Sequence, residues 1–476
     1  MKHNFHPSIL RAYDIRGIYN QTLFDNDAFF VGKAFAKFLT QNNKKKISVS
    51  CDGRLSSPVL KERLIQGLTS SGIDVVDVGV GPTPMLYFSV YHLKTDAGIM
   101  VTGSHNPGDH NGFKMLLKER PYFGQDIINL GKIAAIGDFV EGRGNYETYD
   151  ISEDYVNRLL ADCVIAESES PLLDELDEFE PKKKLKIGWD AGNGAGAEIM
   201  KKIAARLACD NILLFDEIDG SFPNHHPDPT VEKNLQDLIK VVREENCDLG
   251  IAFDGDADRI GVVDNEGEIL WGDQLLIFYA EEILREQKGA TIIADVKASQ
   301  VLFDKIATFG GNPVMWKTGH SFVKAKMKET KAAMAGEMSG HIFFADKYYG
   351  YDDALYAAIR IINIVEKSKF SLAQMRKALP KTFSTAEIRI ECSEEKKFGI
   401  VDQLKERLKK SGIEFNDIDG IRAKNDNGWW LIRASNTQPV LVARCEANSK
   451  ANLEILKENL RQILESCDIQ IPDELK

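Results

Sequence analysis

The stretch from Thr102 to Lys114 carries a serine and a histidine next to each other in a segment rich in turn residues. It reads T-G-S-H-N-P-G-D-H-N-G-F-K and follows the apolar run Gly98 to Val101, which predicts a strand that ends in a polar loop. Glycine, proline and asparagine supply turn geometry here, so we expect Ser104 and His105 at the loop tip, with the serine hydroxyl open to a substrate. Taken alone, the motif leaves open an ordinary turn in which the serine only bonds its own backbone.

A second stretch, Asp254 to Arg259, reads D-G-D-A-D-R and places three carboxylates at alternate positions directly after the apolar run Leu249 to Phe253. On a curled loop these side chains can face one cation, and oxygen-only ligation beside a phosphate suits Mg²⁺. An EF-hand does not fit, because Arg259 stands where glycine is needed and Asn265 where glutamate is needed. A D-x-D-x-T phosphatase nucleophile fits poorly, since Asp258 takes the threonine position. An acidic surface turn is the remaining alternative, although clustered carboxylates repel one another without a cation.

A third stretch, G-E-M-S-G-H, offers Glu337 and Ser339 at alternate positions, which could bind paired sugar hydroxyls. Upstream, K-T-G-H adds two potential cations, Lys317 and His320, although a histidine there could equally be an ordinary surface residue.

A fourth stretch, R-A-S-N-T, lies between two apolar runs near the C-terminus. A guanidinium, two hydroxyls, an amide and backbone N–H groups could together bind a phosphate, with a plain β-turn as the alternative.

Composition limits the class of protein. A chain of 476 residues predicts three or four domains, because single cores stop growing at about 250 to 300 residues. Hydrophobic residues make up 43% and charged residues 28%, and no uncharged apolar run reaches membrane length, so we expect a soluble protein without a membrane partner. A net charge of −12 argues against nucleic acid as a partner. Seven dispersed cysteines without a C-x-x-C pair, and an N-terminus without an apolar targeting core, indicate a cytoplasmic protein.

Three segments repeat one order of elements, which predicts three similar α/β units. Apolar runs that stop at Asp52, Asp190 and Asp295 are each followed by a helical pattern and a further apolar run. Late in each segment another apolar run leads into one of the first three polar stretches described above. Because ligands in open α/β sheets bind beyond the carboxyl ends of strands, these loops are expected to meet.

The apolar periodicity also predicts individual elements. Asp27 to Thr40 and Phe398 to Lys410 are expected as helices, and Ile47 to Cys51 and Ile73 to Val78 as strands. The acidic stretch Glu167 to Lys184 is expected to be a solvated surface connection.

Together the four polar stretches resemble one family, the α-D-phosphohexomutases, and within it the bacterial phosphomannomutase/phosphoglucomutase branch. The motifs T-G-S-H-N-P, D-G-D-A-D-R, G-E-M-S-G-H and R-A-S-N-T stand in the family's order and spacing, and the match runs from Arg11 to Ala447. The resemblance implies an α/β fold with three similar mixed-sheet domains, at residues 1–150, 151–268 and 269–380. A smaller C-terminal α+β domain, at residues 381–476, would complete a central cleft to which each domain lends one loop.

The resemblance also implies a role for each candidate residue. Ser104 would be carried as phosphoserine, with Ser104, Asp254, Asp256 and Asp258 as the Mg²⁺ ligands. The other catalytic residues would be Arg16, His105, Lys114, Arg259 and His341. Substrate-binding residues would be Tyr13, Lys297, His320, Glu337 and Ser339, with Arg433, Ser435, Asn436 and Thr437 on the distal phosphate.

The implied activity is that of an isomerase that interconverts hexose 6-phosphate and hexose 1-phosphate, with mannose, glucose or both as the sugar. It would use hexose 1,6-bisphosphate as intermediate and activator, and phosphosugars as its partners, as a monomer or weak dimer. The alternatives are a phosphoglucosamine or phospho-N-acetylglucosamine mutase, a metal-dependent sugar phosphatase, and a non-catalytic sugar-phosphate-binding protein. Met338 favours the mannose and glucose mutases, because the hexosamine branch usually has glutamine there.

Overall fold

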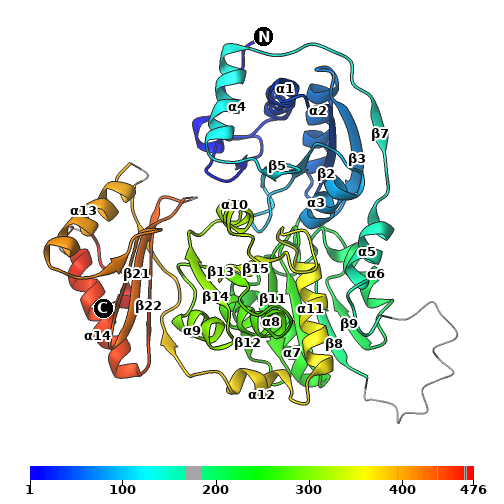
Figure 1. Ribbon diagram of the computed structural model, residues 1–476. Helices are drawn as coiled ribbons and strands as arrows, with labels where there is room; N and C mark the ends of the chain where they lie inside the picture. Colours follow the sequence, from blue (N-terminus) through cyan, green and yellow to red (C-terminus); the bar gives the residue numbers. More distant parts are fainter. Residues whose placement is uncertain (167–183, 394, 437, 466, 468, 476) are drawn as a thin grey trace, which may run out of the picture.

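The computed structural model describes residues 1–166, 184–393, 395–436, 438–465, 467 and 469–475. It contains four β-sheets, each built from one continuous part of the chain (Figure 1). The predicted surface connection Glu167 to Lys184 lies outside the described residues, apart from Lys184 itself.

The first three sheets share one strand order, which confirms the repeat predicted from the sequence. In each unit the first strand pairs in parallel with the second and third, and the third pairs antiparallel with a fourth. This antiparallel fourth strand makes each sheet mixed, as expected. In the first unit these four strands are β2 (Lys46–Cys51), β3 (Asp74–Val80), β4 (Ala97–Val101) and β5 (His110–Leu117). In the second unit they are β8 (Lys186–Asp190), β9 (Asp210–Leu214), β10 (Leu249–Phe253) and β11 (Ile260–Asp264). In the third unit they are β13 (Thr291–Asp295), β14 (Asn312–Trp316), β15 (Met334–Gly336) and β16 (Ile342–Phe344).

Shorter strands extend two of these sheets. The first gains β1 (Ile15–Ile18), β6 (Arg120–Pro121) and β7 (Tyr146–Thr148), and the second gains β12 (Ile269–Leu270). Since β12 pairs with β11, the second sheet reaches two residues past the expected domain limit at 268. The domain limits themselves remain predictions.

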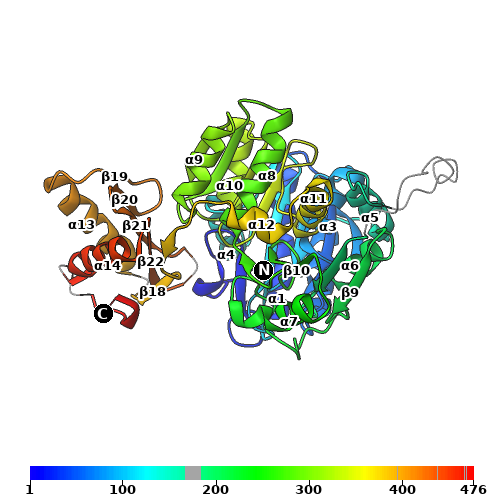
Figure 2. The same cartoon turned by 90° about the horizontal axis from the view of Figure 1, so that it is seen from below.

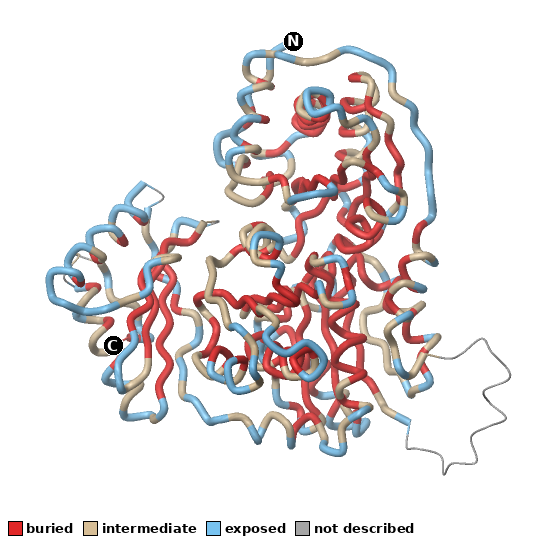
Figure 3. Tube along the Cα trace, viewed as in Figure 1, coloured by how far each residue is buried: buried red, intermediate tan, exposed pale blue. Residues whose placement is uncertain are grey.

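Helices cover the three sheets, and one hydrophobic core continues through all three units. The α3 helix is buried from Thr83 to Val90, so it belongs inside the protein rather than on a surface. Its apolar side chains share a core with residues of the second and third units, such as Trp189 and Tyr356. In Figure 3 the buried part of the trace continues from the first unit into the other two. The helices of these units are α1 (Asp25–Gln41), α2 (Ser57–Thr69), α3 (Thr83–His92), α4 (Gln125–Ile136), α5 (Ser152–Leu160), α6 (Ala197–Ala204), α7 (Gln236–Glu244), α8 (Gly272–Glu286), α9 (Gln300–Thr308), α10 (His320–Thr330), α11 (Ala354–Lys367) and α12 (Leu372–Lys377).

The C-terminal unit is an antiparallel sheet with its own core, set to one side of the other units (Figure 2). A small apolar contact of Trp429 and Leu431 with Val296 joins it to the third unit. Its elements are β17 (Phe383–Ser384), β18 (Ile388–Glu391), α13 (Lys397–Lys410), β19 (Phe415–Asn416), β20 (Ile421–Asn425), β21 (Gly428–Ala434), β22 (Val440–Ala447) and α14 (Lys450–Glu465). Within the described ranges, no helix has the length and apolar character needed to span a membrane.

Candidate functional site

Ser104 lies on the loop between β4 and β5 with a left-handed backbone, at a φ of 51°. Its hydroxyl Oγ donates a hydrogen bond to Asp254 Oδ2 at 3.1 Å and lies 3.2 Å from His105 Nδ1. The expected exposure of this serine is wrong, because only 2% of the residue is exposed. The loop from β10 covers it, and a side chain at Gly255 would collide with Ser104 O. A left-handed non-glycine residue costs about 1 to 2 kcal/mol, and such strain is typical of functional loops.

Arg54, which the sequence analysis did not identify, binds the backbone of this loop through its guanidinium group. Its guanidinium Nη2 donates to the carbonyl oxygens of Ser104 and Asn106, both at 2.6 Å. Nη1 donates to the carbonyl oxygens of Pro107 and His110, and Nε pairs with Asp52. All five N–H donors of a residue that is 1% exposed are therefore used. The available signal was its position, three residues after the first strand of the repeat.

The three aspartates of the loop between β10 and β11 are fully buried, and their donor oxygens lie within 4.8 Å of one another. Lys114 Nζ, from β5, donates to Asp256 Oδ2 at 2.7 Å and also contacts Asp258 Oδ2. Asp256 Oδ1 and Asp258 Oδ1 are buried and accept no hydrogen bond from the described part of the chain. Buried oxygen donors with unsatisfied atoms fit Mg²⁺.

The charges on this loop are unevenly shared. Burial, with Asp258 and Asp256 close by, raises the pKa of Asp254 well above its ordinary value. Burial would also raise the pKa of Asp258, but Lys114 and His341 hold it well below the ordinary value. Of these two carboxylates, Asp258 holds its negative charge more firmly, whereas Asp254, which accepts from the Ser104 hydroxyl, is the more easily protonated.

The loop after β15 places His341 beside Asp258 and Arg259 of the aspartate loop. His341 Nε2 lies 3.3 Å from both Asp258 Oδ1 and Arg259 Nε, and Nδ1 lies 3.0 Å from Glu337 Oε2 and 3.1 Å from Ser339 Oγ. Burial lowers the pKa of His341, but Asp258 and Glu337 more than offset it and raise the pKa to about 9. We therefore expect an imidazolium at neutral pH, whose charge is balanced by the carboxylates of Asp258 and Glu337.

Two other histidines stay neutral. Burial, with Arg259 and Arg16 nearby, holds the pKa of His105 well below its ordinary value. Burial and Lys324 do the same for His320, which begins α10 and stacks on His341 at a centroid distance of 5.7 Å. The cluster therefore contains both a protonated and a proton-accepting imidazole.

Tyr13 connects this cluster to the C-terminal unit. Its hydroxyl donates to Thr318 O at 2.9 Å and accepts from Asn436 Nδ2 at 2.6 Å, so it touches residues of two other units. The ring lies over Gly319, where a Cβ would meet the phenol carbon at 2.5 Å. Gly319 N donates to Glu337 Oε1 at 2.5 Å, so the Glu337 carboxylate is bound to the same segment that Tyr13 contacts.

The fourth predicted loop follows β21. Arg433 Nε pairs with Asp419 Oδ2 at 2.9 Å, and its buried Nη2 has no hydrogen-bond partner in the described residues. Ser435 is 7% exposed, and its Oγ accepts a hydrogen bond from Gln438 N. Thr437 lies outside the described residues.

Two predicted cations stand at the edges of this arrangement. Arg16 bonds Asn106 Oδ1 of the serine loop at 3.1 Å and pairs with Asp14 at 2.5 Å. Lys297 pairs with Glu387 at 3.1 Å, across the junction of the third and fourth units.

The structure thus brings the predicted residues into two groups joined through Tyr13. The first group surrounds Ser104, and the second surrounds Arg433. Glu337, predicted to bind sugar hydroxyls, uses both carboxylate oxygens within the protein in this structure.

Comparison with known proteins gives four matching family models. They are described as phosphoglucomutase/phosphomannomutase alpha/beta/alpha domains I, II and III and the C-terminal domain, and they match residues 7–129, 169–267, 271–383 and 387–463.

Whole-chain relatives agree with these matches. A phosphomannomutase/phosphoglucomutase from Pseudomonas putida is 42% identical, covering 98% of this chain and 97% of the relative. A phosphoglucomutase from Neisseria meningitidis is 40% identical over 97% and 98% of the two chains. A phosphoglucomutase/phosphomannomutase family crystal structure from Burkholderia thailandensis matches with a TM-score of 0.89 and 40% identity, covering 98% of each chain.

Proposed function

The chain belongs to the phosphoglucomutase/phosphomannomutase family, and from this we propose that it interconverts hexose 1-phosphate and hexose 6-phosphate, with both mannose and glucose as sugars. The observation that carries the proposal is the contact of the Ser104 hydroxyl with Asp254, beside two further buried carboxylates and Lys114. A serine oxygen placed there can carry a phosphoryl group next to a cation site, which a phosphate-transferring mutase requires.

In the proposed reaction, phosphorylated Ser104 gives its phosphoryl group to the free hydroxyl of a hexose phosphate. The bond from phosphorus to Ser104 Oγ breaks, a bond to the sugar oxygen forms, and the proton that the sugar hydroxyl loses replaces the phosphoryl group on Ser104 Oγ. The resulting hexose 1,6-bisphosphate turns around, and Ser104 takes back a phosphoryl group from the other end. Added bisphosphate would therefore act as an activator.

His105 suits the proton transfers at Ser104. Its Nδ1 lies 3.2 Å from Ser104 Oγ, and the low pKa of its ring keeps it neutral. It can accept the proton that the hydroxyl loses when Ser104 is rephosphorylated, and return it in the next cycle. His341, protonated at neutral pH, would instead add positive charge to the transfer site.

Asp254, Asp256 and Asp258 would hold Mg²⁺, together with an oxygen on Ser104. When bound, the ion would neutralise phosphate charge, which is the main requirement of catalysis on phosphate monoesters. Lys114 and Arg259 supply further positive charge from either side of the loop.

Two arginines are suited to the two phosphates of the intermediate. Arg16 Nε beside the serine loop and Arg433 Nη2 in the C-terminal unit are both buried, and neither has a partner in the described residues. A buried guanidinium N–H without an acceptor is costly, so an anion at each position would satisfy it. Lys297, His320, Ser435 and Asn436 would complete substrate binding.

A coupled assay tests the proposal. Purified enzyme is given mannose, glucose or glucosamine 1-phosphate with Mg²⁺ and trace hexose 1,6-bisphosphate, and both 6-phosphate and free phosphate are measured. We expect comparable kcat/KM for mannose and glucose, since hydroxyl contacts at C3 and C4 would not distinguish them. Ser104→Ala should lose nearly all mutase activity yet still bind sugar phosphate.

Other results would point elsewhere. Release of free phosphate would indicate a phosphatase, and a preference for glucosamine phosphate would indicate the hexosamine branch. Unchanged turnover in Ser104→Ala would rule out the phosphoserine. We also propose that the enzyme acts in the cytoplasm as a monomer or weak dimer on small phosphosugars.

A further inference from the structure

A hollow of about 530 Å³ lies between the first and third units, away from the loops that surround Ser104. Its walls are the end of β5 with β6, the C-terminal part of α10, and the loop from Ala345 to Tyr351. This volume is within the usual range of small-molecule sites, about 300 to 1,000 Å³.

Its charge is opposite to that of the chain as a whole. Five cationic side chains line the hollow against two carboxylates, Glu119 and Asp346. Both carboxylates are already paired outside it, with Lys44 and Arg360. The lining cations are Lys118, Arg120, Lys324, Lys328 and Lys331.

Three of these lysines, Lys118, Lys328 and Lys331, have no carboxylate within ion-pair distance in the parts of the chain that the structure describes. Lys328 Nζ donates to the carbonyl oxygen of Glu119, which holds the amine at the wall of the hollow. Lysines at the C-terminus of a helix are ordinary, because they offset its partial negative charge. Lys118 has no such role, since it follows β5 in the other unit. Cations from two units thus converge on one space.

Tyrosine rings form the other part of the wall. Tyr349 is 36% exposed, lies 4.9 Å from the ring of Tyr91, and is stacked on Tyr351 at 5.7 Å with an interplanar angle of 2°. Such a rigid aromatic surface can stack a flat heterocycle, at about 1 to 3 kcal/mol per base.

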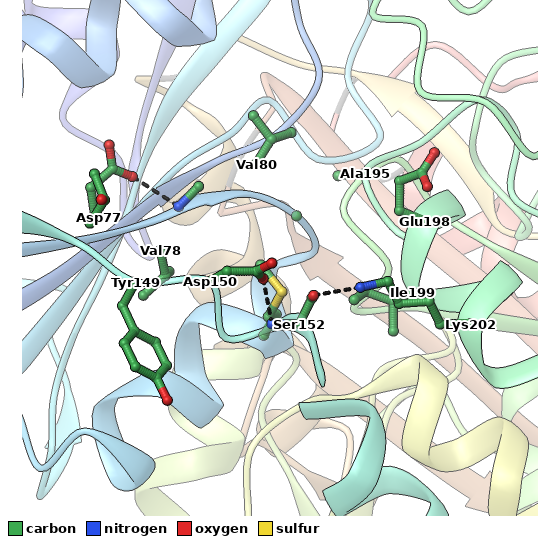
Figure 4. A pocket seen from close by; sticks show the side chains of 14 residues that line it. Asp77, Val78, Val80, Tyr149, Asp150, Ser152, Ala195, Glu198, Ile199 and Lys202 are labelled. Carbon is green, nitrogen blue, oxygen red and sulfur yellow. Dashed lines mark hydrogen bonds between the residues drawn. The ribbon is translucent and has the colours of Figure 1, made fainter. Parts of the chain in front are cut away.

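A second hollow, of about 490 Å³ between the first and second units, provides the contrast (Figure 4). It is lined by Asp77, Asp150 and Glu198, and Lys202 is the one lysine in its described wall. That amine already donates to Ser152 Oγ at 2.6 Å. An anion would be repelled there, so of these two hollows only the first combines an excess of cations with several tyrosine rings.

We propose that the hollow defined by Lys118, Lys328, Lys331, Tyr91 and Tyr349 binds a nucleotide, with its diphosphate on the lysines and its base against the tyrosines. A phosphosugar or inorganic phosphate would use the lysines only, whereas a nucleotide uses both parts of the wall. This site is separate from the mutase site and does not depend on the proposed reaction.

Calorimetric titration of the full chain with ADP, pyrophosphate and adenosine tests the inference. We expect ADP to bind more tightly than pyrophosphate and adenosine to bind weakly. The double variant Lys328→Gln, Lys331→Gln should weaken ADP and pyrophosphate binding at least about tenfold. Tyr349→Ala should weaken ADP about fivefold or more and leave pyrophosphate unchanged.

Lys132→Gln, an exposed charge change on α4, is the matched control and should change neither affinity. Thermal unfolding and basal mutase activity should stay at wild-type values in all variants. The inference is overturned if ADP does not bind, or if the double variant binds ADP as tightly as the wild type does. It is also overturned if excess hexose phosphate displaces ADP from the wild type and from the double variant, because ADP would then occupy the mutase site.

Discussion

Replacing Arg54 by lysine should damage both stability and the rate of phosphoryl transfer. The guanidinium serves five acceptors, namely Asp52 and four carbonyl oxygens of the loop from Ser104 to His110. A lysine has three donors, so at least two buried acceptors lose their partner. At about 1 to 3 kcal/mol each, the free energy of unfolding should fall by about 2 to 6 kcal/mol.

The kinetic effect should be mainly on kcat. Ser104 and Asn106 would lose the donors that fix the loop, and a displacement of about 1 Å can cost about 100-fold in rate. KM should change little, because Arg433 and its neighbours in the C-terminal unit are untouched. Urea unfolding gives the stability, and the coupled mutase assay, run where both proteins are fully folded, gives kcat and KM.

Arg63→Lys is the matched control. Arg63 also belongs to the first unit, on α2, but among the described residues its side chain bonds only Gln66, at 2.6 Å, and it lies over the ring of Phe29. Its replacement should cost less than about 0.5 kcal/mol and leave kcat unchanged. If Arg54→Lys matched this control in both measurements, the loop would not depend on Arg54.

Three further changes test other parts of the site. Asp256→Asn should raise the Mg²⁺ concentration needed for activity and slow turnover by orders of magnitude, and normal activity after chelation would show that the triad is structural. Arg433→Ala should weaken binding of both the 1- and 6-phosphates by about 1.5 to 3 kcal/mol and increase dependence on added bisphosphate, whereas unchanged binding of both would remove it from the distal clamp. Lys297 lowers the pKa of Glu387 to about 2, from the ordinary glutamate value of 4.5. Because the folded state favours the charged carboxylate, the pair stabilises the fold by up to about 3 kcal/mol above pH 4.5, and this contribution is lost as the pH falls from 4.5 towards 2. Unfolding of Glu387→Gln and wild type between pH 7 and pH 3 should show a stability difference that narrows below pH 4.5, and a constant difference would contradict the assignment.

Local features of the sequence predicted most elements. The helix expected over Asp27 to Thr40 runs from Asp25 to Gln41, and the strand at Leu249 to Phe253 has the predicted ends. These elements follow from apolar periodicity and turn residues, which act over a few positions. For the same reason the sequence predicted that loops follow the third strand of each unit.

Features that depend on packing between distant segments were not predictable in this way. The turn residues around Ser104 correctly indicate a loop, but its burial results from contact with Gly255, far along the chain. Arg54 and Asp419 take their roles from loops that approach them only in the folded protein. The position of Arg54 just after a strand indicates only that it lies near a loop, and nothing around Asp419 in the sequence distinguishes it from a surface residue.

The arrangement of the four sheets has a consequence for how the protein folds. Every strand pairing lies within one continuous part of the chain, so each sheet can form as soon as that part has been synthesised. The contacts of the site are different, since Ser104 and Asp254 are separated by 150 positions and Tyr13 and Asn436 by 423. Closing such long loops is slow compared with forming local structure. On the ribosome, three nearly complete units would therefore wait for the last strands of the fourth before the site that they share exists.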